Sequence, residues 1–258
     1  MPRKFPALRP SLPELPRPIV VPFLDRLHQA ARSFPAIFQK SLADYRRLNS
    51  LSTMLECEFI PAREASSKRL MIVLHGLGDS REGFRWLPDA LDLPWLSYLL
   101  VDAPDEYYGG FSWYDFAGDI VPGVRRSREL LFELLEAQRA QGFLSDQICL
   151  GGFSQGCLMS IDVGLRYPRR LAGIVGISGY VCEPEKLIAE LSPVARQQRL
   201  LVTHGQLDPM IPIDAVRQQM QLLQSAGLRV EWHELAKAHN IAGEAELAVI
   251  RNFIRAGY

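Results

Sequence analysis

The sequence predicts an α/β protein with a mostly parallel central sheet flanked by helices. With 258 residues, of which 48% are apolar and 22% are charged, the chain is long enough to bury a sizeable core. Short apolar runs typical of strands buried on both faces recur from residue 69 onward. Between these runs lie longer segments whose apolar residues recur every three or four positions, as in amphipathic helices. Strands that alternate with helices pair in parallel, because each connection crosses back over the sheet.

The first 55 residues differ from the rest, and we expect them to form an N-terminal arm that precedes a body at residues 56–258. Residues 1–22 contain seven prolines, a density that favours extended chain over helix or paired strand. The protein has no formal net charge, yet residues 1–55 carry nine Lys or Arg against three Asp or Glu. The arm is therefore basic and the body is acidic.

The second half of the arm is predicted to be helical. From Pro22 to Leu55 the apolar residues recur at steps of three and four with a break near Pro35, which indicates two amphipathic helices. Their apolar faces need a surface, which is the body, a second copy of the chain or a membrane. We favour the first two over membrane contact. Nucleic acid is not expected as a partner, because no basic patch interleaved with aromatic residues follows.

The cysteines and the lack of long apolar segments bear on the compartment. No C-x-x-C pair and no metal-ligand spacing occurs, so we expect reduced thiols, no metal and no other cofactor; the cysteines are Cys57, Cys149, Cys157 and Cys182. No apolar run approaches the roughly 20 residues that span a bilayer, and recurring prolines leave no signal-peptide segment at the start. A cytoplasmic location is expected.

The first half of the body contains three predicted strands and two loops of interest. The strands are expected at Glu56–Pro61, Arg69–Leu74 and Leu96–Ala103. Two glycines follow the second strand in the loop His75–Ser80, where main-chain N–H groups can turn toward an anionic centre. An aromatic, glycine-hinged loop at Pro104–Phe116 follows the third strand, in a position typical of ligand contacts. The alternative is that its aromatic side chains pack on the body.

The next apolar run, Ile148–Phe153, leads into Ser154, which has a glycine two residues to either side. A strand, a sharp turn and a helix are predicted here, after a helix at Pro122–Gln141. Such a turn exposes a serine at the carboxyl end of a central strand, and the glycines give the chain room to fold back. Ser154 is therefore the candidate nucleophile, although the glycine-serine pattern by itself is equally consistent with an ordinary turn.

The rest of the chain continues the alternation of strands and helices. The predicted elements are, in order, a helix to Tyr167, strands at Leu171–Ser178 and Leu200–Gly205, a helix at Ile213–Ala226, a strand at Leu228–Leu235 and a helix at Gly243–Arg255. Asp208 and His239 follow the last two strands, and groups at the carboxyl ends of parallel strands gather at one edge of the sheet. His75 and His204 also stand at strand ends, but in apolar surroundings, and are interpreted as structural.

Ser154, Asp208 and His239 form a predicted catalytic triad in the chain order serine, aspartate, histidine. In this chemistry the histidine takes the proton of the serine and later returns it to the leaving group. The aspartate orients the imidazole and stabilises its charged form. The main-chain N–H groups of Leu77 and Gln155 are predicted to hold the oxyanion.

With these residues in place, the sequence resembles the carboxylesterase and acyl-protein thioesterase (phospholipase/carboxylesterase) family of α/β hydrolases. The resemblance covers roughly residues 56–258 and rests on five motifs, which are His75-Gly-Leu-Gly-Asp79, Ser112-Trp-Tyr-Asp115, Gly151-Gly-Phe-Ser-Gln-Gly156, His204-Gly-Gln-Leu-Asp-Pro-Met-Ile-Pro212 and the late histidine. It implies an α/β-hydrolase fold and a metal-independent esterase or thioesterase, with the same triad and oxyanion donors. We further expect substrate contacts at Tyr107, Phe111, Trp113 and Met210.

The chain departs from the family pattern at three places. The family usually has a second glycine where Cys157 stands and a Gly-His pair where Ala238-His239 stands, and it lacks an arm of some 55 residues. The leading hypothesis is a serine hydrolase that cleaves carboxylic ester or thioester acyl bonds of a small-molecule substrate through an acyl-enzyme. The alternative is an assembly or membrane-associated module, in which the body has little activity and the arm mediates oligomerisation or surface binding.

Overall fold

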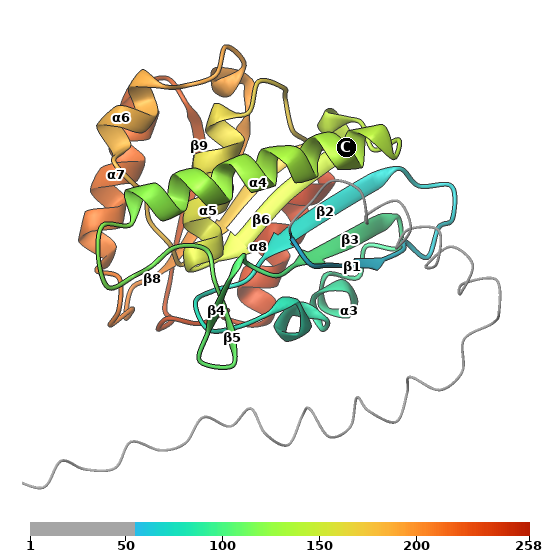
Figure 1. Cartoon of the computed structure of the whole chain (residues 1–258), viewed down its shortest axis with the longest axis horizontal. Coiled ribbons are helices and arrows are strands. Elements are labelled where there is room, and N and C mark those ends of the chain that lie inside the picture. The colour runs from blue at the N-terminus through green and yellow to red at the C-terminus, as the bar shows by residue number, and fades with distance from the viewer. Residues whose placement is uncertain (1–54) are drawn as a thin grey trace, which may run out of the picture. The chain divides into compact units, whose positions relative to one another are not determined.

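A seven-stranded sheet runs through residues 55–258, the part of the chain that the computed structural model describes (Figure 1). In spatial order its strands are β1 (Cys57–Ile60), β3 (Leu96–Val101), β2 (Arg69–Leu74), β6 (Ile148–Phe153), β7 (Gly173–Ile177), β8 (Arg199–Gly205) and β9 (Arg229–Leu235). All neighbouring strands pair in parallel except β1, which lies antiparallel to β3 at one edge. The predicted mostly parallel sheet is confirmed.

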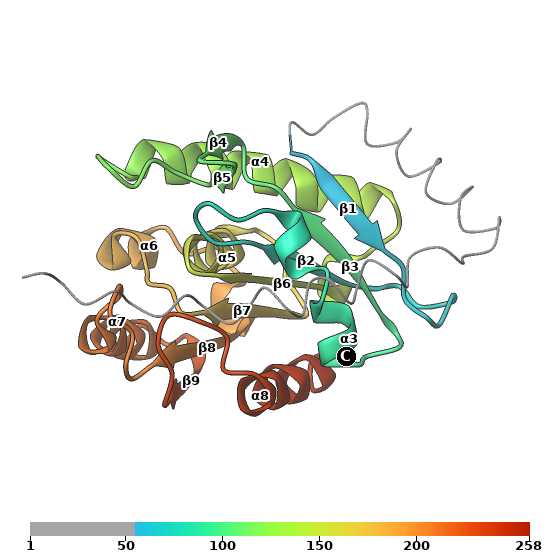
Figure 2. The ribbon, with the colours of Figure 1, turned by 90° about the horizontal axis from the view of Figure 1, so that it is seen from below.

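Helices cover both faces of this sheet (Figure 2). On one face lie α4 (Val121–Ala140), α5 (Gln155–Arg166) and α6 (Pro184–Ala189), and α7 (Ile213–Ser225) packs beside α6 and against β9. On the opposite face lie α3 (Leu87–Leu91) and α8 (Glu244–Arg255), which contact each other. Short 3-10 turns occur at Arg81–Phe84, Ser145–Gln147 and Ala195–Gln197. The architecture is thus three layers, helix on sheet on helix.

The core follows from the apolar runs and amphipathic segments of the sequence. Every residue of β3 is buried, and so are five of the six residues of β2, because both strands are covered on two faces. On α8 the buried apolar positions repeat at helical spacing, at Leu247, Ile250, Phe253 and Ile254. This stripe faces the sheet and completes the core on that side.

The segment predicted as an aromatic loop contains a small hairpin. Its strands β4 (Asp105–Tyr107) and β5 (Gly110–Ser112) pair antiparallel and are joined by Tyr108 and Gly109. Both joining residues have a positive φ, 45° and 89°, which is the backbone that a two-residue hairpin turn requires. The sequence did not suggest the hairpin, because tyrosine is an unusual residue at the first of these positions.

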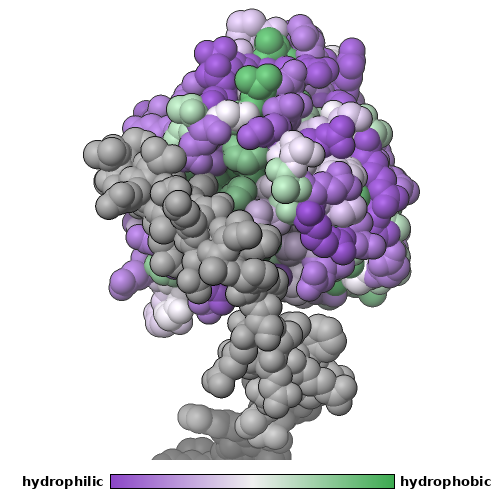
Figure 3. All heavy atoms as spheres, turned by 90° about the vertical axis from the view of Figure 1, so that its right-hand side faces the viewer, coloured by the Kyte–Doolittle hydropathy of each residue, from purple (hydrophilic) through white to green (hydrophobic). Residues whose placement is uncertain are grey.

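Residues 1–54 lie outside the described part of the chain. The extended proline-rich segment, the two amphipathic helices and the oligomer or membrane contacts expected of residues 1–55 therefore stay predictions. Among residues 55–258, no helix combines the length and the apolar character needed to cross a membrane. Figure 3 shows one face of the molecule, on which the described side chains are mostly hydrophilic with a short apolar strip near the middle.

Candidate active site

Ser154 occupies a strained turn between β6 and the first residue of α5. Its backbone angles are φ 54° and ψ −113°, and a positive φ is uncommon for a residue with a side chain. Two glycines make the turn possible. A Cβ on Gly152 would lie 2.5 Å from the carbonyl of Gly156, and a Cβ on Gly156 would lie 2.1 Å from the carbonyl oxygen of Leu74. The glycine spacing in the sequence therefore reflects close backbone contact on both sides of the serine.

We expect the substitution Gly156→Ala to lower the free energy of unfolding by about 1–3 kcal/mol, because the new methyl group meets main-chain atoms that cannot rotate away. Urea unfolding monitored by circular dichroism measures the loss. Gly118→Ala is the matched control, since a Cβ at Gly118 meets no heavy atom within 4 Å. Equal unfolding midpoints for the two variants would contradict the contact.

His239 and Asp208 approach Ser154 from the loops after β9 and β8. The Nε2 atom of His239 lies 2.9 Å from the Oγ atom of Ser154, and its Nδ1 atom lies 2.7 Å from Oδ2 of Asp208. The Asp208 side chain is fully buried, whereas 12% of the His239 side chain is exposed. The structure thus brings together the three residues that the sequence indicated, in the order acid, imidazole, hydroxyl.

The carboxylate of Asp208 is held from several directions. Its Oδ1 atom accepts hydrogen bonds from the main-chain N–H groups of Met210 (2.9 Å) and Ile211 (3.0 Å). Burial by itself raises the pKa of Asp208, but the hydrogen bonds from His239, Ile211 and Met210 outweigh it and hold the pKa below the usual value. Asp208 is therefore ionised at neutral pH, as an acid that orients a histidine must be.

His204 lies behind this carboxylate and has a structural position. Its Nε2 atom is 3.0 Å from the Ile211 carbonyl oxygen, to which it donates, and 3.6 Å from Oδ2 of Asp208. Burial lowers the pKa of His204, so its ring is neutral. His204 thereby holds the loop that presents Asp208 without itself reaching Ser154.

The loop that follows β2 lies directly against the nucleophile. A Cβ on Gly76, the residue before Leu77, would be 3.3 Å from the Cβ of Ser154. Gln155 is the first residue of α5, and its N–H group has no partner within the helix. The N–H groups of Leu77 and Gln155 stay the predicted oxyanion donors.

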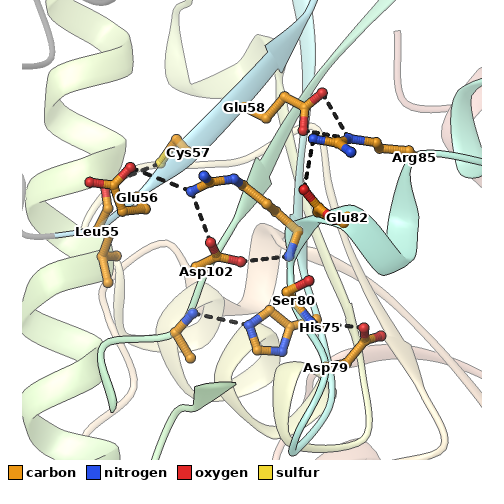
Figure 4. Close-up of polar contacts among 12 residues, drawn as sticks. Leu55, Glu56, Cys57, Glu58, His75, Asp79, Ser80, Glu82, Arg85 and Asp102 are labelled. Atoms are coloured by element: carbon orange, nitrogen blue, oxygen red, sulfur yellow. Dashed lines mark hydrogen bonds and ion pairs between the residues drawn. The ribbon is translucent and has the colours of Figure 1, made fainter. Parts of the chain in front are cut away.

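His75 and Asp102 fix this loop from behind (Figure 4). They follow directly on the paired ends of β2 and β3, because Leu74 and Val101 are in register. The Nε2 atom of His75 accepts the N–H of Ala103 (3.0 Å), so its Nδ1 carries the proton and donates to the Gly76 carbonyl oxygen (2.6 Å). Asp102, also buried, accepts the main-chain N–H of Arg81 (2.6 Å) and pairs with its guanidinium (2.8 Å). The loop is therefore anchored at both ends.

His75 gives a pH dependence of stability. Burial lowers its pKa from the ordinary value of 6.5, so the unfolded chain binds a proton at this position that the folded chain does not. The stabilisation is complete above pH 6.5 and is lost as the pH falls toward the lower pKa of the folded state. We expect His75→Gln, which keeps an acceptor for the Ala103 N–H, to flatten the decline in unfolding free energy by at most about 1.4 kcal/mol per pH unit.

Urea unfolding at a series of pH values between neutrality and mild acid measures this slope. His233→Gln on the partly exposed β9 is the control, since the Nε2 atom of His233 pairs with the neighbouring, exposed Glu231. A His75→Gln slope that equals the wild-type slope would contradict the assignment.

The β4–β5 hairpin is bound to both halves of the site. Main-chain hydrogen bonds join Phe111 to Gly78 (2.9 Å) and to Asp79 (2.8 Å) in the loop after β2. The side chain of Gln155 reaches the residues after the hairpin, where its Oε1 accepts the N–H of Trp113 (2.9 Å) and its Nε2 donates to the Tyr114 carbonyl oxygen (3.0 Å). The sequence pattern does not indicate this role of the Gln155 side chain, because the partners lie more than 40 positions away.

The four residues expected to contact substrate fall into two groups. Tyr107 and Phe111 lie beside the loop after β2, Met210 lies beside Asp208, and all three are at least partly exposed. Trp113 is different, since its side chain is completely buried and its Nε1 donates to the His75 carbonyl oxygen (2.9 Å). Trp113 therefore presents no exposed surface in this structure, and this tryptophan supports the loop from within the core.

Cys157 stands where the family usually has glycine. Its side chain is accommodated by two glycines, one in β7 and one just after it. A Cβ on Gly176 would be 2.7 Å from the Cys157 Sγ atom, and a Cβ on Gly179 would be 2.5 Å from it. The family pattern leaves room between helix and strand through a glycine on the helix, whereas here the glycines in and after β7 leave that room. Burial raises the pKa of Cys157 to about 12, so it is a neutral thiol. Within residues 55–258, no group of three or more His, Cys, Asp or Glu side chains is placed to hold a metal ion.

A serine, a histidine and a buried aspartate in line at the carboxyl ends of parallel strands define the class of serine hydrolases with the α/β-hydrolase fold. Comparisons with known proteins agree with this class. Residues 55–257 match the family described as Phospholipase/Carboxylesterase. The chain therefore belongs to the phospholipase/carboxylesterase family, and it is a hydrolase of ester or thioester bonds.

Individual relatives agree with this assignment. An acyl-protein thioesterase 1 of Schizosaccharomyces pombe is 36% identical in an alignment of 155 residues that covers 55% of this chain and 69% of the relative. An acyl-protein thioesterase 1 of Yarrowia lipolytica is 28% identical in an alignment of 214 residues that covers 76% of this chain and 94% of the relative. Among solved structures, that of esterase PE8 is similar with a TM-score of 0.72 and 28% identity, over 79% of this chain and 99% of that one.

Proposed function

We propose that the protein cleaves acyl esters and acyl thioesters through a covalent acyl intermediate on Ser154. The single observation that carries this proposal is the continuous contact from Asp208 through His239 to the Oγ atom of Ser154. A serine hydroxyl is a weak nucleophile, and a neutral imidazole within hydrogen-bond reach is the base that activates it.

Each step is assigned to a named group. As the Ser154 oxygen attacks the acyl carbonyl carbon, its proton moves to Nε2 of His239. The negative charge that develops on the carbonyl oxygen is met by the N–H groups of Leu77 and Gln155. His239 then returns the proton to the departing alcohol or thiol. Water attacks the acyl-enzyme with the same help from His239, and the acid is released. Asp208 keeps the Nδ1 proton of His239 in place and stabilises the imidazolium.

The surface near the triad favours substrates with an apolar acyl chain. Large apolar side chains are exposed on the loops that carry the site, with exposed fractions of 37% for Tyr107, 70% for Leu207 and 69% for Met210. Exposed apolar side chains gathered at a concave or loop-rich site typically contact ligand. We propose that the acyl chain lies against these three residues, and the thioesterases among the relatives support a thioester as one leaving-group class.

The test combines a covalent probe with a substrate series. A fluorophosphonate probe is expected to label the protein, and peptide mapping by mass spectrometry is expected to locate the label on Ser154. Hydrolysis of p-nitrophenyl acetate, butyrate, octanoate and palmitate, and of an S-palmitoylated peptide, gives the chain-length profile and the preference between ester and thioester. A folded protein that is neither labelled nor active on any of these substrates would refute the proposal.

A further inference from the structure

A buried ion pair lies in the segment that carries His239, and no step of the proposed mechanism uses it. The Nζ atom of Lys237 contacts Oε1 of Glu246, with only 2% of the lysine side chain and none of the glutamate side chain exposed. Lysine and glutamate are rarely buried unless they are paired, and each loses a large hydration energy on burial. The chain therefore maintains a costly pair two residues before its proposed general base.

The pair joins three elements around the His239 loop, which comprises residues 236–243. Glu246 belongs to α8, and its second carboxylate oxygen accepts the N–H of Ala242 (2.6 Å) at the far end of the loop. The carbonyl oxygen of Lys237 accepts the N–H of Leu207 (3.0 Å), the residue before Asp208. The side-chain pair thus connects α8 with the His239 loop, and the main chain of Lys237 connects this loop with the Asp208 loop.

The main chain near Lys237 also lies directly on the end of β8. A Cβ on Gly205 would be 2.4 Å from the carbonyl oxygen of Lys237 and 2.7 Å from that of Ala238. Close contact of this kind fixes where the loop leaves the sheet, while Glu246 fixes where it returns to α8. His239 lies between these two points, so its reach toward Ser154 depends on both.

A purely stabilising role does not explain this arrangement. Replacing a buried ion pair by apolar residues of similar size is often neutral or even stabilising, because the desolvation cost of the charges disappears. An apolar pair, however, has no acceptor for the Ala242 N–H and sets no specific distance between loop and helix. The charged pair instead sets the distance between the His239 loop and α8.

We propose that Lys237 and Glu246 are positioning residues, whose ion pair sets the His239 loop so that His239 reaches Ser154 and Asp208 at the same time. The inference rests on the proposed role of His239. A displacement of His239 by about 1 Å is expected to lower kcat by roughly tenfold to a hundredfold. Binding of the acyl chain is expected to stay the same, because it uses other residues.

The test begins with Lys237→Met in the full chain, assayed with p-nitrophenyl butyrate. We expect kcat to fall by at least about tenfold while KM stays within about twofold, because the acyl-chain contacts are elsewhere. The rate of fluorophosphonate labelling at Ser154 is expected to fall in parallel. Glu246→Gln keeps an oxygen that accepts the Ala242 N–H, so its kcat is expected to lie between those of wild type and Glu246→Met.

Two further variants separate positioning from folding. Lys186→Met is the matched control, since Lys186 is a partly exposed residue of α6 that pairs with Glu183 just before the helix, and its kcat is expected to stay within about twofold of wild type. The double variant Lys237→Met with Glu246→Met leaves no unpaired buried charge, and it decides the question where the single variant fails to fold. Positioning predicts that the folded double variant still has a kcat at least about tenfold low.

The outcomes are distinguishable from a failure of the proposed function. Wild-type protein that neither hydrolyses the ester nor accepts the probe overturns the proposed function and this inference together. Active wild type with a folded double variant whose kcat lies within twofold of it overturns the inference alone. A rise in KM as large as the fall in kcat also overturns the inference. So does an equal fall in kcat in Lys186→Met.

Discussion

Replacing Ser154 by alanine is expected to lower kcat for ester hydrolysis by about 10⁶-fold, the loss seen when a hydrolase of this kind is deprived of its nucleophile. The reason is that no acyl-enzyme can form, so His239 is left with only water to activate. Some catalysis over the uncatalysed rate is expected to remain, because the N–H groups of Leu77 and Gln155 still stabilise the oxyanion. Steady-state hydrolysis of p-nitrophenyl butyrate measures the change, and fluorophosphonate labelling is expected to disappear.

Ser160→Ala is the matched control for this experiment. Ser160 lies on α5, which begins directly after the nucleophile, is fully buried, and donates to the Gly156 carbonyl oxygen (2.8 Å). We expect its kcat to stay within about twofold of wild type, since the helix carbonyl keeps its main-chain partner. Unchanged activity in a folded Ser154→Ala protein would rule out Ser154 as the nucleophile.

The placement of the site was predictable because each of its residues is marked by the sequence directly around it. Ser154, Asp208 and His239 each follow an apolar run, and parallel strands bring their carboxyl ends to one edge of the sheet. The strands themselves were predictable for the same reason, since runs such as Ile148–Phe153 are too apolar to lie anywhere but in the core. Sequence order and strand position together specify these residues without any knowledge of contacts.

Side-chain direction was not predictable, and Trp113 is the clearest case. Its aromatic neighbours Tyr107 and Phe111 are at least partly exposed, whereas Trp113 is buried against His75. The difference arises because the chain leaves the β4–β5 hairpin at Ser112 and turns into the core, where Gln155 binds its main chain. A composition rich in aromatic residues indicates neither that turn nor which ring lies inside.

The partners of the buried charged side chains could likewise not be predicted from the sequence. Lys237 and Glu246 belong to residue types that are normally exposed, and they meet only because α8 folds back under the His239 loop. Asp102 pairs with Arg81 from a different strand end, 21 positions away. Such partners depend on the tertiary arrangement, which local patterns do not encode.

Replacing Asp208 by asparagine is expected to lower kcat by about 10⁴-fold, the effect of holding a catalytic histidine in the wrong tautomer. The two oxygens of Asp208 have different partners, since Oδ1 accepts the N–H groups of Met210 and Ile211 and Oδ2 faces Nδ1 of His239. An asparagine will place its oxygen toward the two N–H donors, which leaves its NH₂ group facing the histidine. That group donates to Nδ1, so the ring proton moves to Nε2.

A histidine protonated at Nε2 presents a donor to Ser154 and cannot accept the serine proton. The loss is therefore expected in kcat rather than KM, with the fold retained because the hydrogen bonds from Met210 and Ile211 remain. Asp214→Asn provides the control, as Asp214 is exposed in the first turn of α7 and pairs with Arg217. If Asp208→Asn keeps more than about a tenth of the wild-type kcat, the tautomer of His239 is set by something other than Asp208. Slow labelling of Asp208→Asn by the fluorophosphonate probe, with Ser154 still the labelled residue, distinguishes a misoriented base from a lost nucleophile.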